Sequence, residues 1–141
     1  MRLLIACMYV LLATTLTGCV YSYRIEASKP TDVLAKSQLE PFWIQNGFAR
    51  DFSSICDQQF LPPELSLIEC WQKIWRGPFG MIDGLVEATE STEKGNLIVL
   101  IGGGRNRVKV EEIAEKLKGY LAASSPPIET VITVNRSCCD F

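Results

Sequence analysis

Histidine is absent from this chain of 141 residues. A serine or cysteine nucleophile therefore has no histidine base to activate it, which excludes the commonest hydrolase sites. No two cysteines have the C-x-x-C spacing of a zinc site or of a thioredoxin-like redox site. Asp83 and Glu87 are two of 16 acidic residues, and such a pair alone does not indicate glycoside hydrolysis. We therefore expect a protein that is not an enzyme and that holds no metal.

An excess of basic residues is also lacking. Lys and Arg total 14 against 16 Asp and Glu, which gives a formal net charge of −2 at pH 7. Charges of both signs are mixed along the chain, as is usual for a solvated surface. A nucleic-acid partner requires a basic face, so we expect none.

Long apolar segments are lacking beyond the first residues. The chain opens MRLLIACMYVLLATTLTGC, in which Arg2 precedes a nearly unbroken apolar run from Leu3 to Leu12. This run is shorter than the roughly 20 residues that a helix needs to cross a bilayer. A positive residue, a short apolar segment and small residues before a cleavage point are the three regions of an export signal. The pattern predicts a signal peptide over residues 1–18.

The segment closes on LTGC, Leu16 to Cys19, which resembles the lipobox of bacterial lipoprotein precursors. The resemblance covers only the start of the chain. It implies that a type II signal peptidase cuts before Cys19, that diacylglycerol is attached to the Cys19 thiol, and that the new N-terminus is acylated. Apart from these covalent lipids we expect no cofactor. Two or more acyl chains hold a protein stably on a membrane.

The resemblance also implies a location. The mature chain, residues 19–141, would be a single lipid-anchored domain of the cell envelope, and its length is ordinary for one domain. Val20 stands where an aspartate tends to keep lipoproteins of enteric-type bacteria in the inner membrane. The absence of that aspartate favours the inner leaflet of the outer membrane, facing the periplasm. We expect no nucleotide ligand, because the outer envelope has no ATP pool.

Export permits disulfide bonds among the cysteines of the mature chain. Cys7 would leave with the signal, and Cys19 would carry lipid. The cysteines that remain are Cys56, Cys70, Cys138 and Cys139. They allow three connectivities, of which we favour Cys56–Cys70, because closing a loop of about 15 residues contributes about 3 kcal/mol in the chain-entropy model. Cys138 and Cys139 are poor partners for each other, since neighbours on a strand point to opposite faces. A crossed pattern that links both to Cys56 and Cys70 stays open.

Alternating and β-branched segments predict strands along much of the chain. The expected strands cover residues 20–28, 80–91, 96–102 and 128–138. The segment ECWQKIWRG fits either a short strand or one helical turn, and residues 49–69 have no clear period and are interpreted as a loop. TEKGN has the composition of a turn. NLIVLIG is the most apolar strand, so we expect it at the centre of the sheet.

Two helices are expected between these strands. The first lies between an N-cap at Thr31 or Asp32 and a stop at Gly47, with Ala35, Leu39, Phe42 and Trp43 on one side. Pro41 should kink this helix or end it early. The second covers VEEIAEKLKGYLAAS, where apolar residues recur at helical spacing. They are Ile113, Leu117, Tyr120 and Leu121.

The resulting order of strands and helices is β-α-loop-β-β-α-β. This order is typical of the split βαβ, or ferredoxin-like, arrangement. We therefore predict an α+β fold in which two helices cover one face of a four-stranded antiparallel sheet.

The stretch LIVLIGGGRNR, Leu97 to Arg107, joins an apolar strand to three glycines and two arginines. It matches neither the Walker A pattern nor the dinucleotide fingerprint, because position 107 is Arg where the last glycine of that fingerprint should be. Arg105 and Arg107 could hold an anion at a helix start or contact an acidic partner. The interpretation we favour is a flexible connection in which glycine supplies positive φ.

The middle of the chain is rich in aromatic residues, most of which should lie in the core. Trp71 and Trp75 are the candidates for exposed rings that would stack on sugars or contribute to a protein interface. Like the glycine loop, they are candidates for binding and not for catalysis.

These observations favour a small lipid-anchored lipoprotein that binds, assembles or scaffolds other envelope components, with an envelope protein as partner. Two alternatives stay open. An inhibitor or immunity-type lipoprotein against a cell-wall-degrading enzyme needs a protruding loop, for which the Arg105–Arg107 and Cys56–Cys70 loops are candidates. A glycan- or lipid-binding module needs an exposed Trp71 or Trp75.

Overall fold

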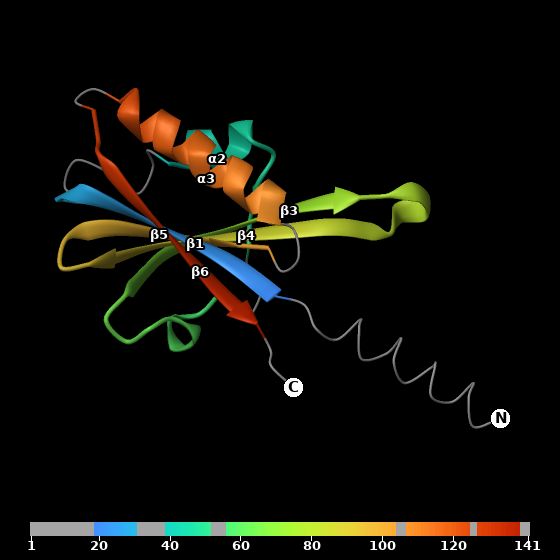
Figure 1. Cartoon of the computed structure of the whole chain (residues 1–141), viewed down its shortest axis with the longest axis horizontal. Coiled ribbons are helices and arrows are strands. Elements are labelled where there is room, and N and C mark those ends of the chain that lie inside the picture. The colour runs from blue at the N-terminus through green and yellow to red at the C-terminus, as the bar shows by residue number, and fades with distance from the viewer. Residues whose placement is uncertain (1–18, 31–38, 52–55, 104–106, 125–126, 139–141) are drawn as a thin grey trace.

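A computed structural model describes residues 19–30, 39–51, 56–103, 107–124 and 127–138 of the chain. Within these residues one antiparallel sheet has six strands in the order β2-β3-β4-β5-β1-β6 (Figure 1). The strands are β1 (Cys19–Pro30), β2 (Ala49–Arg50), β3 (Ser66–Arg76), β4 (Ile82–Glu93), β5 (Asn96–Gly102) and β6 (Thr130–Cys138), and the α-helices are α2 (Glu40–Gln45) and α3 (Arg107–Ala122). The α+β class is the one expected from the sequence.

The expected four-stranded ferredoxin-like sheet is wrong in detail. The strand through ECWQKIWR extends back to Ser66, with a register shift between Leu67 and Glu69, so β3 has 11 residues and pairs along β4. β2, within the segment interpreted as a loop, then pairs with the outer edge of β3. One split unit is nevertheless present. β1 lies between β5 and β6 and is antiparallel to both, so β5 and β6 are parallel and are joined through α3.

The two helices lie on one face of the sheet, and the segment before β3 crosses the other face (Figure 1). This segment is held by a disulfide bond between Cys56 and Cys70, whose Cα atoms are 6.0 Å apart. The expected pairing is therefore confirmed, and the crossed pattern is excluded. Leu65 and Ile98 are buried on this second face, so the disulfide-held segment gives the sheet a small second apolar layer.

Helix α3 supplies one side of the main core, with five buried residues at steps of three and four. They are Val110, Ile113, Ala114, Leu117 and Leu121. Tyr120, expected in this set, is 36% exposed because it lies on the flank of the buried stripe. On the solvent side, Lys116 and Glu112 form a pair at 3.0 Å. The hydrogen bond from Lys116 and its positive charge hold the pKa of Glu112 below its usual value, and the charge of Lys73 lowers it further.

Helix α2 is shorter than the sequence suggested. It begins at Glu40 after Leu39, and Pro41 occupies its first turn, where a missing backbone N–H has no cost. Pro41 therefore starts the helix and does not end it. The expected stop at Gly47 is confirmed, since Gly47 has φ of +81° and its N–H donates to the Ile44 carbonyl. The expected N-caps, Thr31 and Asp32, lie outside the described residues, as does Ala35.

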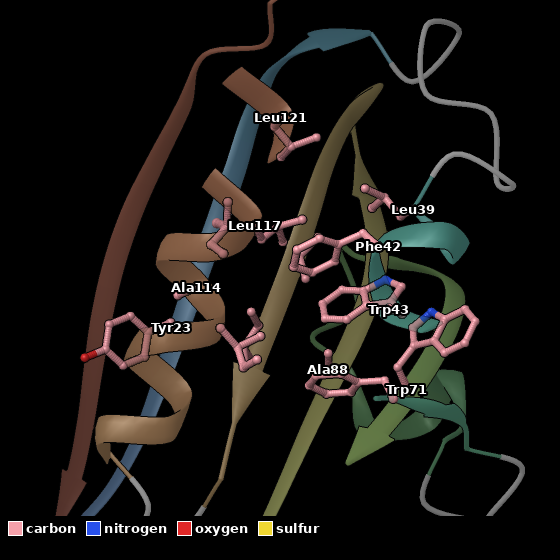
Figure 2. Close-up of a cluster of buried hydrophobic side chains, with 14 of the residues drawn as sticks. Tyr23, Leu39, Phe42, Trp43, Trp71, Ala88, Ala114, Leu117 and Leu121 are labelled. Carbon is pink, nitrogen blue, oxygen red and sulfur yellow. The ribbon is translucent and has the colours of Figure 1, made fainter. Parts of the chain in front are cut away.

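A buried carboxylate joins α2 to the sheet. Glu90 on β4 is only 2% exposed, and its Oε1 accepts hydrogen bonds from Trp43 Nε1 at 2.6 Å and Trp71 Nε1 at 2.8 Å. Trp43 lies on α2 and Trp71 on β3, and their rings are side by side (Figure 2). The two planes are 22° apart, with centroids separated by 6.3 Å. One oxygen atom thus connects the helix and two strands.

The Glu90 network predicts different effects for two substitutions. Glu90→Gln keeps an oxygen acceptor, whereas Glu90→Leu leaves two buried indole N–H groups without a partner, which costs about 1–3 kcal/mol for each group. We expect Glu90→Leu to lower the free energy of unfolding by at least about 2 kcal/mol more than Glu90→Gln does. Urea unfolding measures this difference.

The matched control is Glu87→Leu, because Glu87 is exposed on the same strand. Its effect should stay within about 0.5 kcal/mol. Equal losses for the two Glu90 variants would show that the indole hydrogen bonds do not hold α2 on the sheet.

Candidate binding surfaces

The two tryptophans expected at the surface differ in their environment. Trp71 is 3% exposed and faces α2 beside Glu90, so the expectation that it could be an exposed ring is wrong. Trp75 is partly buried and lies opposite Gly84 across the β3–β4 pair. The ammonium groups of Lys73 and Lys109 lie over its ring, at 4.8 Å and 4.6 Å from the centroid. A sugar ring would have to compete with these cations, which leaves the glycan-binding alternative without an open platform.

The glycine loop has a packing role. Arg105 lies outside the described residues, and Arg107 is the exposed first residue of α3. Neither Gly102 nor Gly103 has positive φ, so that expectation is wrong for both. At Gly103 an added Cβ would lie 2.7 Å from Val110 Cγ2 and 2.9 Å from the Leu85 carbonyl oxygen. Glycine is needed at Gly103 because α3 and β4 approach the backbone closely.

The β3–β4 hairpin is a surface that the sequence did not reveal. β4 pairs with β5 only from Glu87 onward, so among the described residues its first part pairs with β3 alone. The hairpin consequently projects from the body of the molecule (Figure 1). Its end is closed by a hydrogen bond of 2.7 Å from the Gly77 N–H to the Met81 carbonyl. Arg76 Nη1 donates to the Gly80 carbonyl at 3.2 Å.

Residues 77–82, called the hairpin tip from here on, are apolar where a turn is usually polar. Phe79 is fully exposed at 102%, Met81 is 69% exposed and Ile82 is 64% exposed. Phe79 also has φ of +61°, a conformation that bulky residues rarely adopt. The signal in the sequence was RGPFGM, in which glycine and proline mark a turn but phenylalanine and methionine occupy it. Exposed large apolar side chains gathered in one short segment are typical of an interaction site.

The outer edge of β6 is a second exposed surface. β6 is the last strand in the sheet, and among the described residues nothing pairs with its outer side. Its nine residues pair with β1 without a bulge. The stretch from Thr130 to Asn135 carries no charge and no proline, and Val131 and Val134 are 64% and 48% exposed. Natural proteins usually protect such an edge with charges, prolines or bulges.

One of the two remaining cysteines lies at the end of β6. Cys138 is its last residue and stands directly across from Cys19, the first residue of β1. Cys139 is outside the described residues. Within the described part of the chain, no group of three or more cysteine or acidic residues could hold a metal ion, and no helix is both long and apolar enough to cross a membrane.

Comparison of the chain with family models, with curated proteins and with solved structures found no match. The function is therefore inferred from the chemistry of the protein's own described surfaces.

The glycine loop gives a prediction with an internal control. Gly103→Ala forces Val110 and the Leu85 carbonyl to move, and we expect a loss of about 1–3 kcal/mol in the free energy of unfolding. Gly102→Ala meets only the Ser22 Cβ at 4.0 Å, so it should be neutral or stabilising by up to about 1 kcal/mol. Thermal or urea unfolding of the two variants distinguishes them. Equal stability would show that Gly103 is not required for packing.

Proposed function

We propose that the protein is a non-catalytic lipoprotein of the cell envelope that binds another envelope protein by pairing with one of its strands along the edge of β6. The observation that carries the binding mode is the unprotected outer side of β6, whose backbone groups are available to an added strand. In strand addition, the main-chain hydrogen bonds provide affinity and the side chains on alternate positions provide specificity.

The anchor is the second part of the proposal. LTGC supports cleavage before Cys19 and acylation of its thiol. Cys19 is also the first residue of β1 and is paired from that position, so no linker would separate the folded domain from the lipid. At about 3.3 Å per residue, the β6 edge from residue 135 to 130 would lie roughly 10–26 Å from the anchored end. A suitable partner therefore presents its strand close to the membrane surface.

The β6 edge also restricts the chemistry of the partner. Val131 and Val134 project from opposite faces of the strand, because neighbours alternate. An added strand should thus offer apolar or β-branched side chains on both faces. It should carry no run of like charges and no proline at a position where its N–H must donate.

One observation favours the inhibitor alternative, namely the protruding hairpin. Arg105 of one loop considered from the sequence lies outside the described residues. However, the register of β1, β5 and β4 puts the hairpin tip at the same end of the sheet as Cys19, so a short anchor would direct it toward the membrane and away from a soluble hydrolase. We therefore rank this function second.

The proposal predicts a periodic set of crosslinks in living cells. A photoreactive residue placed in turn at Val131, Thr133 and Asn135 should capture the same envelope protein. The captured positions on that protein should advance by two residues at each step, because residues on one face of paired strands are two apart. Mass spectrometry of the adducts measures this spacing.

Two controls accompany the crosslinks. The same reagent at Glu87, exposed on an inner strand, should capture no strand-spaced series. Cys19→Ser should abolish both the incorporation of a fatty-acid analogue and membrane retention. Fatty-acid labelling of the Ser variant would refute the anchor, and crosslinks without the two-residue spacing would refute strand addition.

A further inference from the structure

The register of the sheet places the hairpin tip and Cys19 at one end. Ser22 on β1 is opposite Gly102 on β5, and Gly102 is in turn opposite Glu87 on β4. Since β1 and β4 are both antiparallel to β5, they run in the same direction. Counting back three residues from Ser22 reaches Cys19 on β1, and counting back three from Glu87 reaches Gly84 on β4. Cys19 and Gly84 therefore lie at about the same level along the strands.

The hairpin continues past this level. Ile82 is two residues beyond Gly84, which corresponds to about 7 Å along a strand, and the rest of the tip extends further. From this juxtaposition we propose that the hairpin tip inserts into the surface of the same bilayer that holds the lipid on Cys19. This inference rests on the proposed anchor and adds a second, non-covalent membrane contact.

The side chains at each level fit this position. Phe79, Met81 and Ile82 are exposed apolar groups at the far end, and interfacial protein segments bury such groups about 5–10 Å into the boundary between headgroups and acyl chains. Trp75 is opposite Gly84, so it lies at the level of Cys19. Tryptophan is enriched at that depth because its ring is amphipathic.

Charged groups lie at the base of the tip and not at its end. Lys73 and Lys109 lie over the Trp75 ring, and Arg76 precedes the tip. These cations are placed where lipid phosphates would lie. Asp83 is exposed beside Gly77, so the base carries both signs of charge. A zwitterionic membrane surface is therefore sufficient for the proposed contact.

Without a linker between Cys19 and β1, the domain has little freedom to keep the hairpin tip away from the bilayer. Because Cys19 is paired with Cys138 from the first position of β1, the thioether would hold this end of the sheet against the membrane. A tip that projects beyond Cys19 must then either enter the bilayer surface or tilt the whole domain. Entry buries three exposed apolar side chains, whereas tilting leaves them in water.

The experiment uses the full acylated protein in phosphatidylcholine vesicles whose acyl chains carry bromine, which quenches indole fluorescence on contact. Phe79→Trp adds one indole at the tip, and the wild-type protein provides the background of its own tryptophans. Lys94→Trp is the matched control, because Lys94 is an exposed turn residue at the opposite end of β4. A fatty-acid label on Cys19 and flotation with the vesicles verify the anchor in every sample.

We expect brominated lipid to reduce the added Phe79→Trp fluorescence by about twofold or more, as for a group within the acyl boundary, and to leave the added Lys94→Trp fluorescence unchanged. A soluble quencher should show the reverse order. Labelled, floating protein whose Phe79→Trp signal is quenched only by the soluble reagent would overturn the hairpin insertion alone. Absence of the label on Cys19 would overturn the anchor and the insertion together.

Discussion

The arrangement of the molecule depends on one buried carboxylate oxygen shared by two indole N–H groups. Glu90 holds Trp43 of α2 and Trp71 of β3 at the same point, which determines the face of β3 that meets the helices. A shift of one residue in β3 would turn Trp71 away from Glu90 and would turn Cys70 away from the segment that its disulfide holds. The register that extends β3 and β4 into the projecting hairpin is therefore set within the core.

The same sheet separates two kinds of contact. The hairpin tip lies at the end of the sheet where Cys19 begins β1, whereas the edge of β6 runs along the side of the sheet. An anchor at Cys19 would bring the apolar end to the bilayer and leave the β6 edge facing the aqueous compartment. The proposed membrane attachment and partner binding would then use different surfaces, so that each could be altered without the other.

Local signals in the sequence predicted a large part of this fold. Short-range chemistry was enough to predict four features. They are the turn at Lys94 and Gly95, the inner position of β5, the stop at Gly47 and the Cys56–Cys70 pairing. The number of strands was not predicted. The segment that forms β3 fitted either a short strand or a helical turn, and β2 has only two residues and carries no periodic signal.

The candidate surfaces were harder to predict than the fold. Burial of Trp71 depends on a distant carboxylate, and a sequence with 16 acidic residues does not show which of them lies in the core. The hairpin tip was not predicted, because glycine and proline indicate a turn without showing that its apolar residues project.

The most direct test of the proposed orientation on the membrane is hydrogen–deuterium exchange of the acylated protein on lipid vesicles, compared with the Cys19→Ser chain free in solution. We expect slower exchange on vesicles at residues 77–82 and unchanged exchange at residues 130–135. Protection of the β6 edge by lipid, or no change at the hairpin tip, would contradict it.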